Sequence, residues 1–329
     1  MTGPPLSLWR VAPPEASRAE SGTGTVALAA PMPAASAGAV SVWFHEAMRR
    51  GCRRSQDVEV WLPAYRGKSL VRLLTWLVTE RLAGPGAAVT WRLDKRQGPD
   101  SVARMLTALG WAGITRKRDG RVIELTGQPP ATVSMPDPEC FTERIGGQDL
   151  TFSADYGVFS PRRVDDGTAL LAAVALSQPA VDTVADIGIG YGALAIALMV
   201  NETARSAVAT DVDSVALWLA EANARRYAVD LKVTCTPNPL DVPPTPLTVC
   251  NMPTHIDASS SGALMAGLVQ RTRRGRLLLV VHRALEGRYA RHLANAGLVV
   301  DRHPGPAHVV LAARARRSPW PGTRESRSP

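Results

Sequence analysis

The stretch Val184-Ala185-Asp186-Ile187-Gly188-Ile189-Gly190-Tyr191-Gly192 decides which fold the sequence predicts. It starts as an apolar strand, ends that strand on an acidic residue, and turns through three glycines into an Ala/Leu-rich helix. Glycine lets the backbone approach a ligand where a Cβ atom would collide. The Asp186 carboxylate would repel a pyrophosphate, but it suits a ligand that carries a positive charge. The stretch therefore predicts a binding loop for a cationic ligand.

Strands and helices alternate on both sides of this loop. We expect strands over residues 184–187, 207–210, 232–235, 247–251, 276–281, 297–301 and 308–312. We expect helices over residues 192–200, 214–227, 261–271 and 285–296. Strands joined by helices of this length pair in parallel through right-handed crossovers. The sequence predicts an α/β, Rossmann-like domain with a mostly parallel seven-stranded sheet over residues 139–313.

A second acidic residue follows at the expected distance. Asp211 stands at the predicted tip of the second strand, about 20 residues after the glycine loop, where a carboxylate can accept both ribose hydroxyls of a nucleotide. Either Asp211 or Asp213 could instead cap the helix that begins at Ser214. We assign the cap to Asp213 and the ribose to Asp211.

The first half of the chain shows a different pattern. Residues 1–40 are rich in Pro, Ala, Ser and Gly and are expected to be disordered. Residues 41–127 predict a smaller α/β domain that lacks a glycine-rich loop, with a hairpin turn at Asp119-Gly120. A linker with four prolines spans residues 128–138, and residues 314–329 form a basic tail that is expected to be disordered.

The positive charge is concentrated outside the second domain. Of the net charge of +9, residues 41–125 carry +8 and residues 126–310 carry −3. This asymmetry favours a polyanionic partner for the first domain, although a solvated Arg-rich surface is the alternative. Basic residues at the ends of predicted elements are the candidate phosphate contacts: Arg66, Lys68, Lys95, Arg96, Arg116, Lys117 and Arg118. The tryptophans of this domain, which include Trp91 and Trp111, are expected in its core rather than stacked on bases.

Other function classes receive no support from the composition. The four cysteines form no Cys-x-x-Cys pair and lie near no His cluster, so we predict no metal site and expect four buried small hydrophobes. No apolar run approaches the ~20 residues of a membrane-spanning helix. A signal peptide is disfavoured because no basic segment precedes the apolar residues 25–40, so a cytoplasmic protein is expected.

The third motif carries a resemblance to a known family. Val249-Cys250-Asn251-Met252-Pro253-Thr254-His255 ends the fourth strand, where ribosomal RNA guanine-N2 methyltransferases of the methyltransferase small-domain family have Asn-Pro-Pro-Phe-His. Asp155-Tyr156-Gly157-Val158-Phe159-Ser160-Pro161 and Asp165-Asp166-Gly167-Thr168 resemble two further elements of that family. The resemblance extends over residues 55–313 and is loose in the first half.

The resemblance implies S-adenosylmethionine as the cofactor and ribosomal RNA as the partner. It implies that the first domain is a degenerate copy of the second that helps to hold RNA. The cofactor-binding residues would be Phe159, Asp186, Gly188, Gly190, Gly192, Asp211, Asn238 and Asn251. The target would be the exocyclic amine of a guanine, whose two N–H bonds the Asn251 side-chain oxygen and the Met252 carbonyl would accept. The reaction then proceeds by positioning, and no strong general base is required.

The chain departs from the family at three positions. Met252 replaces a proline, Thr254 replaces the aromatic residue expected to stack on the target base, and Asn238 stands where an acidic residue usually contacts adenine. Activity on a protein amide or a small metabolite, and a non-catalytic RNA-binding protein, are therefore the alternatives. His255 is a candidate general base, but a structural role is favoured, and Phe159 either covers the cofactor or fills the core.

Overall fold

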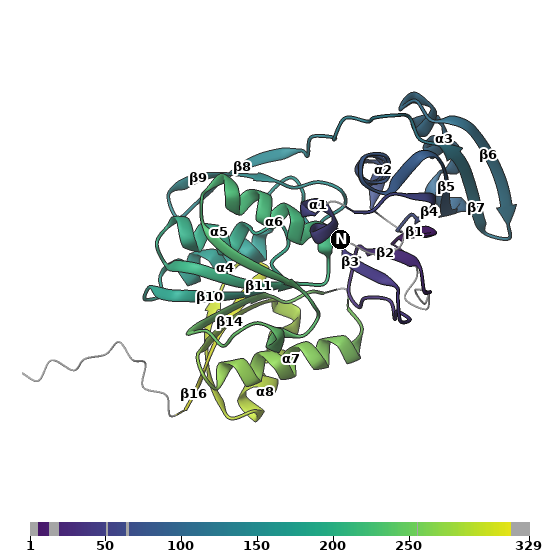
Figure 1. The fold of residues 1–329 in the computed structure, drawn as a ribbon. Helices are drawn as coiled ribbons and strands as arrows, with labels where there is room; N and C mark the ends of the chain where they lie inside the picture. The colour runs from purple at the N-terminus through teal and green to yellow at the C-terminus, as the bar shows by residue number, and fades with distance from the viewer. Residues whose placement is uncertain (1–5, 13–19, 51, 64–65, 255, 317–329) are drawn as a thin grey trace, which may run out of the picture. The chain divides into compact units, whose positions relative to one another are not determined.

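The protein divides into two compact units, each built around its own sheet. The structure is a computed structural model that describes residues 6–12, 20–50, 52–63, 66–254 and 256–316 of the 329-residue chain. The N-terminal unit comprises residues 1–141, 151–163 and 212–222, and the C-terminal unit comprises residues 142–150, 164–211 and 223–329. Figure 1 shows the fold of the described residues.

The N-terminal unit contains a seven-stranded sheet in the order β3-β2-β1-β4-β5-β7-β6. The first five strands pair in parallel, and β7 pairs antiparallel with both β5 and β6. Its strands are β1 (Leu8–Val11), β2 (Thr23–Ala27), β3 (Val40–Trp43), β4 (Ser55–Trp61), β5 (Ala83–Asp94), β6 (Ala112–Asp119) and β7 (Val122–Gln128). Its helices are α1 (Phe44–Arg49), α2 (Gly67–Leu77), the π-helix η1 (Val78–Leu82), the short η2 (Lys95–Gln97) and α3 (Pro99–Ala108).

The expectation that residues 1–40 are disordered is wrong. Strands β1 and β2 lie inside this range, and β3 begins at Val40. Trp9 and Val11 are fully buried, and the indole of Trp9 covers Gly24, where an added Cβ would lie only 2.4 Å from the ring. The N-terminal domain therefore begins at β1 rather than at residue 41, because pairing with β4 buries strands that have little apolar periodicity of their own.

The C-terminal unit contains the sheet predicted from the glycine loop, in the order β12-β11-β10-β13-β14-β16-β15. Its strands are β10 (Val181–Ile187), β11 (Ala204–Asp211), β12 (Asp230–Cys235), β13 (Leu247–Asn251), β14 (Arg276–His282), β15 (Leu298–Pro304) and β16 (His308–Ala315). All pairs are parallel except β14–β16 and β15–β16. The helices are α4 (Asp166–Leu176), α5 (Ala193–Val200), α7 (Ala258–Thr272) and α8 (Glu286–Asn295), with short η3 (Pro239–Asp241) and η4 (Arg283–Leu285). Helix α6 (Ser214–Arg226) begins in the N-terminal unit and ends in the C-terminal unit.

The two sheets have the same topology. Numbered from the start of each unit, both follow the order 3-2-1-4-5-7-6, with the same antiparallel final pair. This confirms the expectation of a mostly parallel seven-stranded sheet preceded by a second α/β domain of the same design. In such open sheets, ligands bind beyond the carboxyl ends of the strands, where the strand order reverses.

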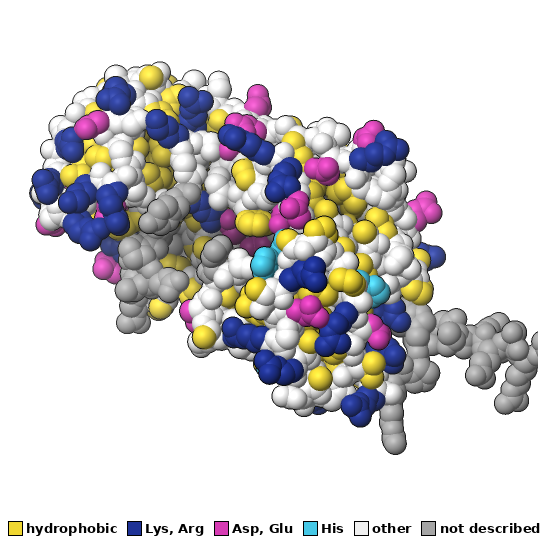
Figure 2. All heavy atoms as spheres, turned by 180° about the vertical axis from the view of Figure 1, so that it is seen from behind, with side chains coloured by type: hydrophobic (Ala, Val, Ile, Leu, Met, Phe, Trp, Pro, Cys, Tyr) yellow, Lys and Arg dark blue, Asp and Glu magenta, His cyan; other side chains and the backbone are white. Residues whose placement is uncertain are grey.

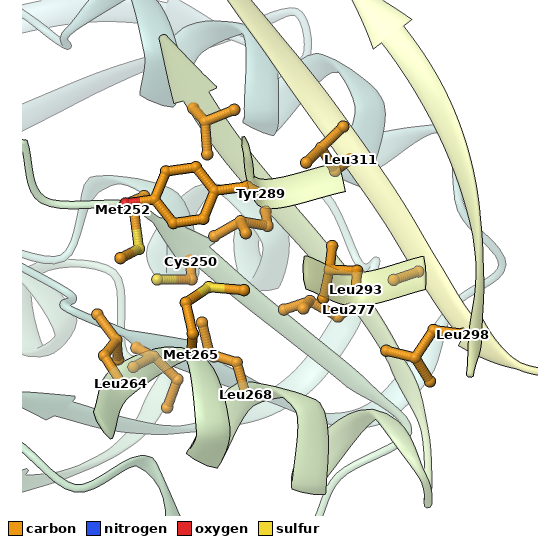
Figure 3. Close-up of a cluster of buried hydrophobic side chains, with 14 of the residues drawn as sticks. Cys250, Met252, Leu264, Met265, Leu268, Leu277, Tyr289, Leu293, Leu298 and Leu311 are labelled. Atoms are coloured by element: carbon orange, nitrogen blue, oxygen red, sulfur yellow. The ribbon is translucent and has the colours of Figure 1, made fainter. Parts of the chain in front are cut away.

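Helices cover both faces of the C-terminal sheet. Helices α4 and α5 lie on one face, and α7 and α8 lie on the other (Figure 1). The α7–α8 face buries a cluster that includes Leu268, Leu279, Leu293 and Leu311, all fully buried. Met252 belongs to this cluster and lies beside Cys250 and Tyr289 (Figure 3). Its side chain therefore serves the core.

Several features were missed or misjudged from the sequence. The hairpin of β8 (Cys140–Ile145) and β9 (Gln148–Ser153) and the whole of α4 were not predicted. Cys235 and Cys250 are buried as expected, but Cys140 is exposed and Cys52 is half-buried. Strand β16 runs to Ala315, inside the expected C-terminal tail, whose residues 317–329 lie outside the described part. No helix among the described residues is long and apolar enough to cross a membrane.

Candidate active site

The glycine loop between β10 and α5 adopts a backbone conformation that residues with a side chain rarely adopt. Gly188, Gly190 and Gly192 adopt φ angles of 79°, 59° and 96°, in the left-handed region where glycine carries no steric cost. A Cβ atom added at Gly188 or Gly190 would meet nothing within 4 Å, so the loop faces open space. The amides of Gly188 and Ile189 both donate to the Thr210 carbonyl, at 2.8 and 3.0 Å, which fixes the loop to the neighbouring strand.

Two polar side chains hold this loop from outside. Asp211, the last residue of β11, accepts a hydrogen bond from the Gly190 amide at 2.8 Å. Asn223, fully buried on α6, donates to the Tyr191 carbonyl at 2.9 Å. Sequence reasoning missed Asn223, although an asparagine inside an apolar helix is a usable signal. Asp211 therefore lies against the loop, as its proposed ribose contact requires.

Asp186, at the end of β10 just before the loop, is buried and has a strongly raised pKa. Its side chain is 2% exposed, and no donor among the described residues reaches Oδ2. The pKa of this carboxyl is raised from 3.8 to about 7, mainly by burial; a backbone hydrogen bond from Ala195 lowers it, and the charge of Asp211 adds a smaller increase. A buried carboxylate with an unused oxygen beside an open glycine loop fits a cationic ligand.

Asn251 ends β13, adjacent to β10 in the sheet. Its Nδ2 donates to Oδ2 of Asp165 at 2.7 Å and to Oγ1 of Thr168 at 2.9 Å. Both acceptors belong to the start of α4, which Asp165 caps by accepting from the Thr168 amide at 3.1 Å. The Asp-x-x-Thr motif noted in the sequence therefore positions Asn251, a relation that local spacing does not reveal.

Asn238 is already engaged within its own loop. Its Oδ1 accepts from the Leu240 amide at 3.1 Å, and its Nδ2 donates to Asp241 at 2.7 Å. Asp241 also accepts from the Thr236 hydroxyl at 2.5 Å, so an acidic side chain stands three residues beyond the predicted adenine contact. An adenine contact by Asn238 remains a prediction, and Asp241 joins it as a candidate.

The Asn251-Met252-Pro253-Thr254 turn exposes only its second half. Met252 is 4% exposed, whereas Pro253 and Thr254 are exposed, and His255 lies outside the described residues. The Met252 amide donates to the Val280 carbonyl at 3.1 Å, which holds the turn against β14. The buried Met252 side chain is withdrawn from solvent, whereas Pro253 and Thr254 present exposed side chains, and the catalytic roles of all three stay predictions.

A histidine pair that sequence reasoning missed lies at the same edge of the sheet. His282 ends β14 and is paired in register with His308 at the start of β16. The two rings meet edge to face, with their centroids 5.6 Å apart. His282 Nδ1 accepts from the Ala284 amide at 3.2 Å, so neutral His282 carries its proton on Nε2.

In the N-terminal unit, Asp213 caps α6, as expected. Its Oδ1 accepts from the amides of Val215 and Ala216 at 2.9 and 3.4 Å, and its Oδ2 pairs with Arg66 at 2.7 Å. Arg66 therefore secures this cap with a side chain only 17% exposed, and its phosphate contact stays a prediction. Phe159 is 70% exposed, which excludes the core role and leaves cofactor contact as a prediction.

The other candidate phosphate contacts lie on the surface of the N-terminal unit. Lys68, Lys95, Arg96, Arg116, Lys117 and Arg118 are all exposed. Lys and Arg side chains are exposed over the part that carries β5 to β7 (Figure 2). Arg96 pairs with Asp94, and Arg116 pairs with Asp100. Trp91 and Trp111 pack edge to face in the core with centroids 5.9 Å apart, as expected, whereas Trp43, Trp61 and Trp76, for which core packing was also expected, are half-buried.

Comparison with known proteins finds matches mainly in the second half of the chain. Residues 149–298 match the family described as methyltransferase small domain. The chain is 28% identical over 179 residues to ribosomal RNA small subunit methyltransferase C of Acinetobacter baumannii, covering 51% of this chain and 50% of that protein. It is 33% identical over 87 residues to an uncharacterized Bacillus subtilis protein, YbxB, covering 26% of this chain and 43% of that protein. The chain thus spans about half the length of the curated relatives it matches.

One solved structure shares the fold of both units. A T. thermophilus 16S rRNA N2-guanine methyltransferase, solved with AdoMet and guanosine, superposes with a TM-score of 0.70 at 18% identity. The match covers 96% of this chain and 90% of that one. At this identity the likeness shows the fold alone. It supports the predicted fold, a mostly parallel seven-stranded sheet preceded by a second α/β domain.

Proposed function

We propose that this protein, whose residues 149–298 match the methyltransferase small domain, is an S-adenosylmethionine-dependent methyltransferase that acts on the exocyclic amine of a guanine in ribosomal RNA. One observation carries the proposal. Adjacent strands β11, β10 and β13 end in Asp211, the Asp186 loop and Asn251, around glycines that face open space. The open loop and the strand-end side chains thus lie at one edge of a single sheet.

The residues at this edge fit the cofactor. S-Adenosylmethionine carries a sulfonium and an ammonium group, and it supplies an activated methyl group when bound. The buried, unpartnered Oδ2 of Asp186 suits its positive charge. Asp211 suits the ribose hydroxyls, and the space in front of Gly188 and Gly190 admits the ligand.

Asn251 is the proposed orienting residue for the target. A guanine amine is a poor nucleophile because its lone pair is delocalised into the ring. The Asn251 oxygen and the Met252 carbonyl accept the two N–H bonds, which turns the lone pair toward the methyl group. This is catalysis by positioning. The methylated amine then loses one proton to water, so no side-chain base is required.

The basic surface of the N-terminal unit is the proposed RNA contact. Residues 41–125 carry a net charge of +8, and the candidate side chains there are exposed. Lys and Arg side chains that meet phosphates supply affinity with little sequence preference. The relatives named for ribosomal RNA methylation support the choice of RNA as the partner.

Methyl transfer from labelled S-adenosylmethionine tests the proposal. Total RNA and ribosomal subunits from a strain that lacks the gene serve as acceptors, followed by nucleoside analysis. We expect label in N2-methylguanosine, and we expect the Asn251→Ala protein to transfer at least about tenfold less, which corresponds to about 1.4 kcal/mol of barrier. No labelled nucleoside in any RNA pool would refute the RNA assignment.

The exposed Thr254 supports a second candidate, a methyltransferase for a protein amide or a small metabolite. An aromatic residue at this position would stack on a base, which is worth ~1–3 kcal/mol, and threonine cannot do so. The salt dependence of RNA binding separates the two candidates, because phosphate contacts make affinity fall steeply with salt. Calorimetry with S-adenosylmethionine distinguishes both enzymes from a non-catalytic RNA-binding protein, because such a protein need not bind the cofactor.

A further inference from the structure

We propose that Asp165 and Thr168 lock the side-chain amide of Asn251 in one orientation, so that the site presents a hydrogen-bond acceptor and selects amino groups over carbonyl groups. This inference rests on the proposed function and defines the class of group that the site accepts. It gives Asp165 and Thr168 a positioning role, since both act through Asn251.

The hydrogen bonds around Asn251 allow only one orientation of its amide. Nδ2 lies 2.7 Å from Oδ2 of Asp165, and an ionised carboxylate can only accept hydrogen bonds. Nδ2 also lies 2.9 Å from the Thr168 hydroxyl, whose own hydrogen points to Asp165 at 3.2 Å. Flipping the amide would place Oδ1 against the Asp165 carboxylate, which has no hydrogen to donate. The nitrogen therefore faces α4, and the oxygen faces away from it.

Asp165 and Thr168, which together form the clamp on Asn251, are held in place by the first turn of α4. Asp165 accepts from the Thr168 amide at 3.1 Å, and its carbonyl accepts from the Ala169 amide at 2.8 Å. Gly167 lets this turn lie close to β16, since an added Cβ would come within 3.2 Å of the His308 ring and 3.3 Å of Asp165 Oδ2. Hydrogen bonds to the backbone of α4 therefore fix the position of the Asp165 carboxylate.

The orientation has a chemical consequence for the substrate. The oxygen that Asn251 presents accepts an N–H bond, so an exocyclic amine is held. A carbonyl oxygen at the same position would meet another oxygen and lose a hydrogen bond. An asparagine that turned freely would serve either group, because its amide offers both a donor and an acceptor.

Two substitutions of Asp165 separate the clamp from the helix cap. Asn and Ser are both strong N-cap residues, so Asp165→Asn and Asp165→Ser should preserve α4. The asparagine keeps a side-chain oxygen at the same reach. The serine hydroxyl is one bond shorter and can also donate, so it no longer dictates the amide orientation. Thr168→Val removes the second acceptor, and Asp166→Asn removes a neighbouring exposed carboxylate as the matched control.

The experiment measures methyl transfer to RNA, cofactor affinity and thermal unfolding for these variants. We expect Asp165→Ser and Thr168→Val to lower kcat at least about tenfold while the Kd of S-adenosylmethionine changes less than about twofold. Asp165→Asn and Asp166→Asn should retain most of the activity. Equal activity of Asp165→Ser and Asp165→Asn would overturn the inference.

The thermal stability of a second set of variants tests the clamp without an activity assay. Asn251→Asp places two carboxylates face to face, so we expect its Tm at pH 8 to fall by about 5 °C and to recover partly when Asp165→Ser is added. If the wild type transfers no methyl group to RNA, the proposed function fails and this pair of variants still tests the clamp. An unchanged Tm for Asn251→Asp would overturn the inference.

Discussion

Asp186, the proposed partner of the cationic cofactor, is predicted to destabilise the folded protein. Its folded pKa of about 7 lies above the ordinary 3.8, so the folded state holds a proton that the unfolded state releases between these values. Stability therefore falls as pH rises from about 4 to about 7, and stays low above that. The difference corresponds to about 4 kcal/mol at most. Asp186→Asn removes the charge and should raise the free energy of unfolding at pH 8 by about 2–4 kcal/mol.

Urea unfolding at pH 5 and pH 8 measures this effect, with calorimetry for the cofactor. The stabilisation by Asp186→Asn should be large at pH 8 and small at pH 5, where most of the wild-type side chain is protonated. The same substitution should abolish measurable binding of S-adenosylmethionine, because the neutral amide does not attract its cations. Wild-type affinity should rise between pH 6 and pH 8. A variant that is less stable than wild type at pH 8, or that binds the cofactor normally, would refute the reasoning.

Two further predictions concern basic residues, one buried in the C-terminal unit and three exposed on the N-terminal unit. Arg271 is 5% exposed and donates to the carbonyls of residues 239, 242 and 243 and to two threonine hydroxyls. Arg271→Met should therefore cost about 3–5 kcal/mol in urea unfolding and weaken cofactor binding through the Asn238 loop, whereas the exposed Arg273→Met should do neither. Replacing Arg116, Lys117 and Arg118 by alanine should flatten the salt dependence of RNA binding by about two to three in log–log slope and leave cofactor affinity unchanged. An unaltered slope would exclude this hairpin from the RNA contact.

Local sequence signals predicted the parts of the fold that depend on local chemistry. The expected strand at residues 247–251 matches β13, and Asp213 caps α6 as its spacing indicated. Both are decided by residues within one turn or one strand. The loop conformation at Gly188, Gly190 and Gly192 was likewise readable, because a left-handed backbone requires glycine.

The features that escaped prediction depend on residues far apart in the chain. Strands β1, β2 and β3 have four or five residues each and are separated by Pro- and Gly-rich segments, so only pairing in the sheet makes them strands. Asp165, the partner of Asn251, is 86 residues away in the sequence. Arg66 forms an ion pair with Asp213, although the linker and the β8–β9 hairpin separate them in the sequence. Composition and periodicity carry no information on such pairs.

The repeated strand order raises the question of how many cofactors the chain binds. By topology, β2 and β4 of the N-terminal sheet correspond to β11 and β13. They end in Ala27 and Trp61, where the C-terminal sheet ends in Asp211 and Asn251. Ala27 is buried and offers no hydrogen bond to a ribose, and the Trp61 ring lies under the Arg92 guanidinium, 5.4 Å away.

One S-adenosylmethionine per chain is the expected stoichiometry. The N-terminal sheet shares the topology, but the described ends of its strands β2 and β4 carry neither the carboxylate nor the amide that the proposed site needs. A shared fold therefore need not bring the same binding chemistry. Calorimetric titration should give one site, and Asp211→Asn should weaken that single binding event without uncovering another. A second site that survives Asp211→Asn would show that the N-terminal copy binds the cofactor through other residues, and would refute this assignment of the chemistry to the strand ends.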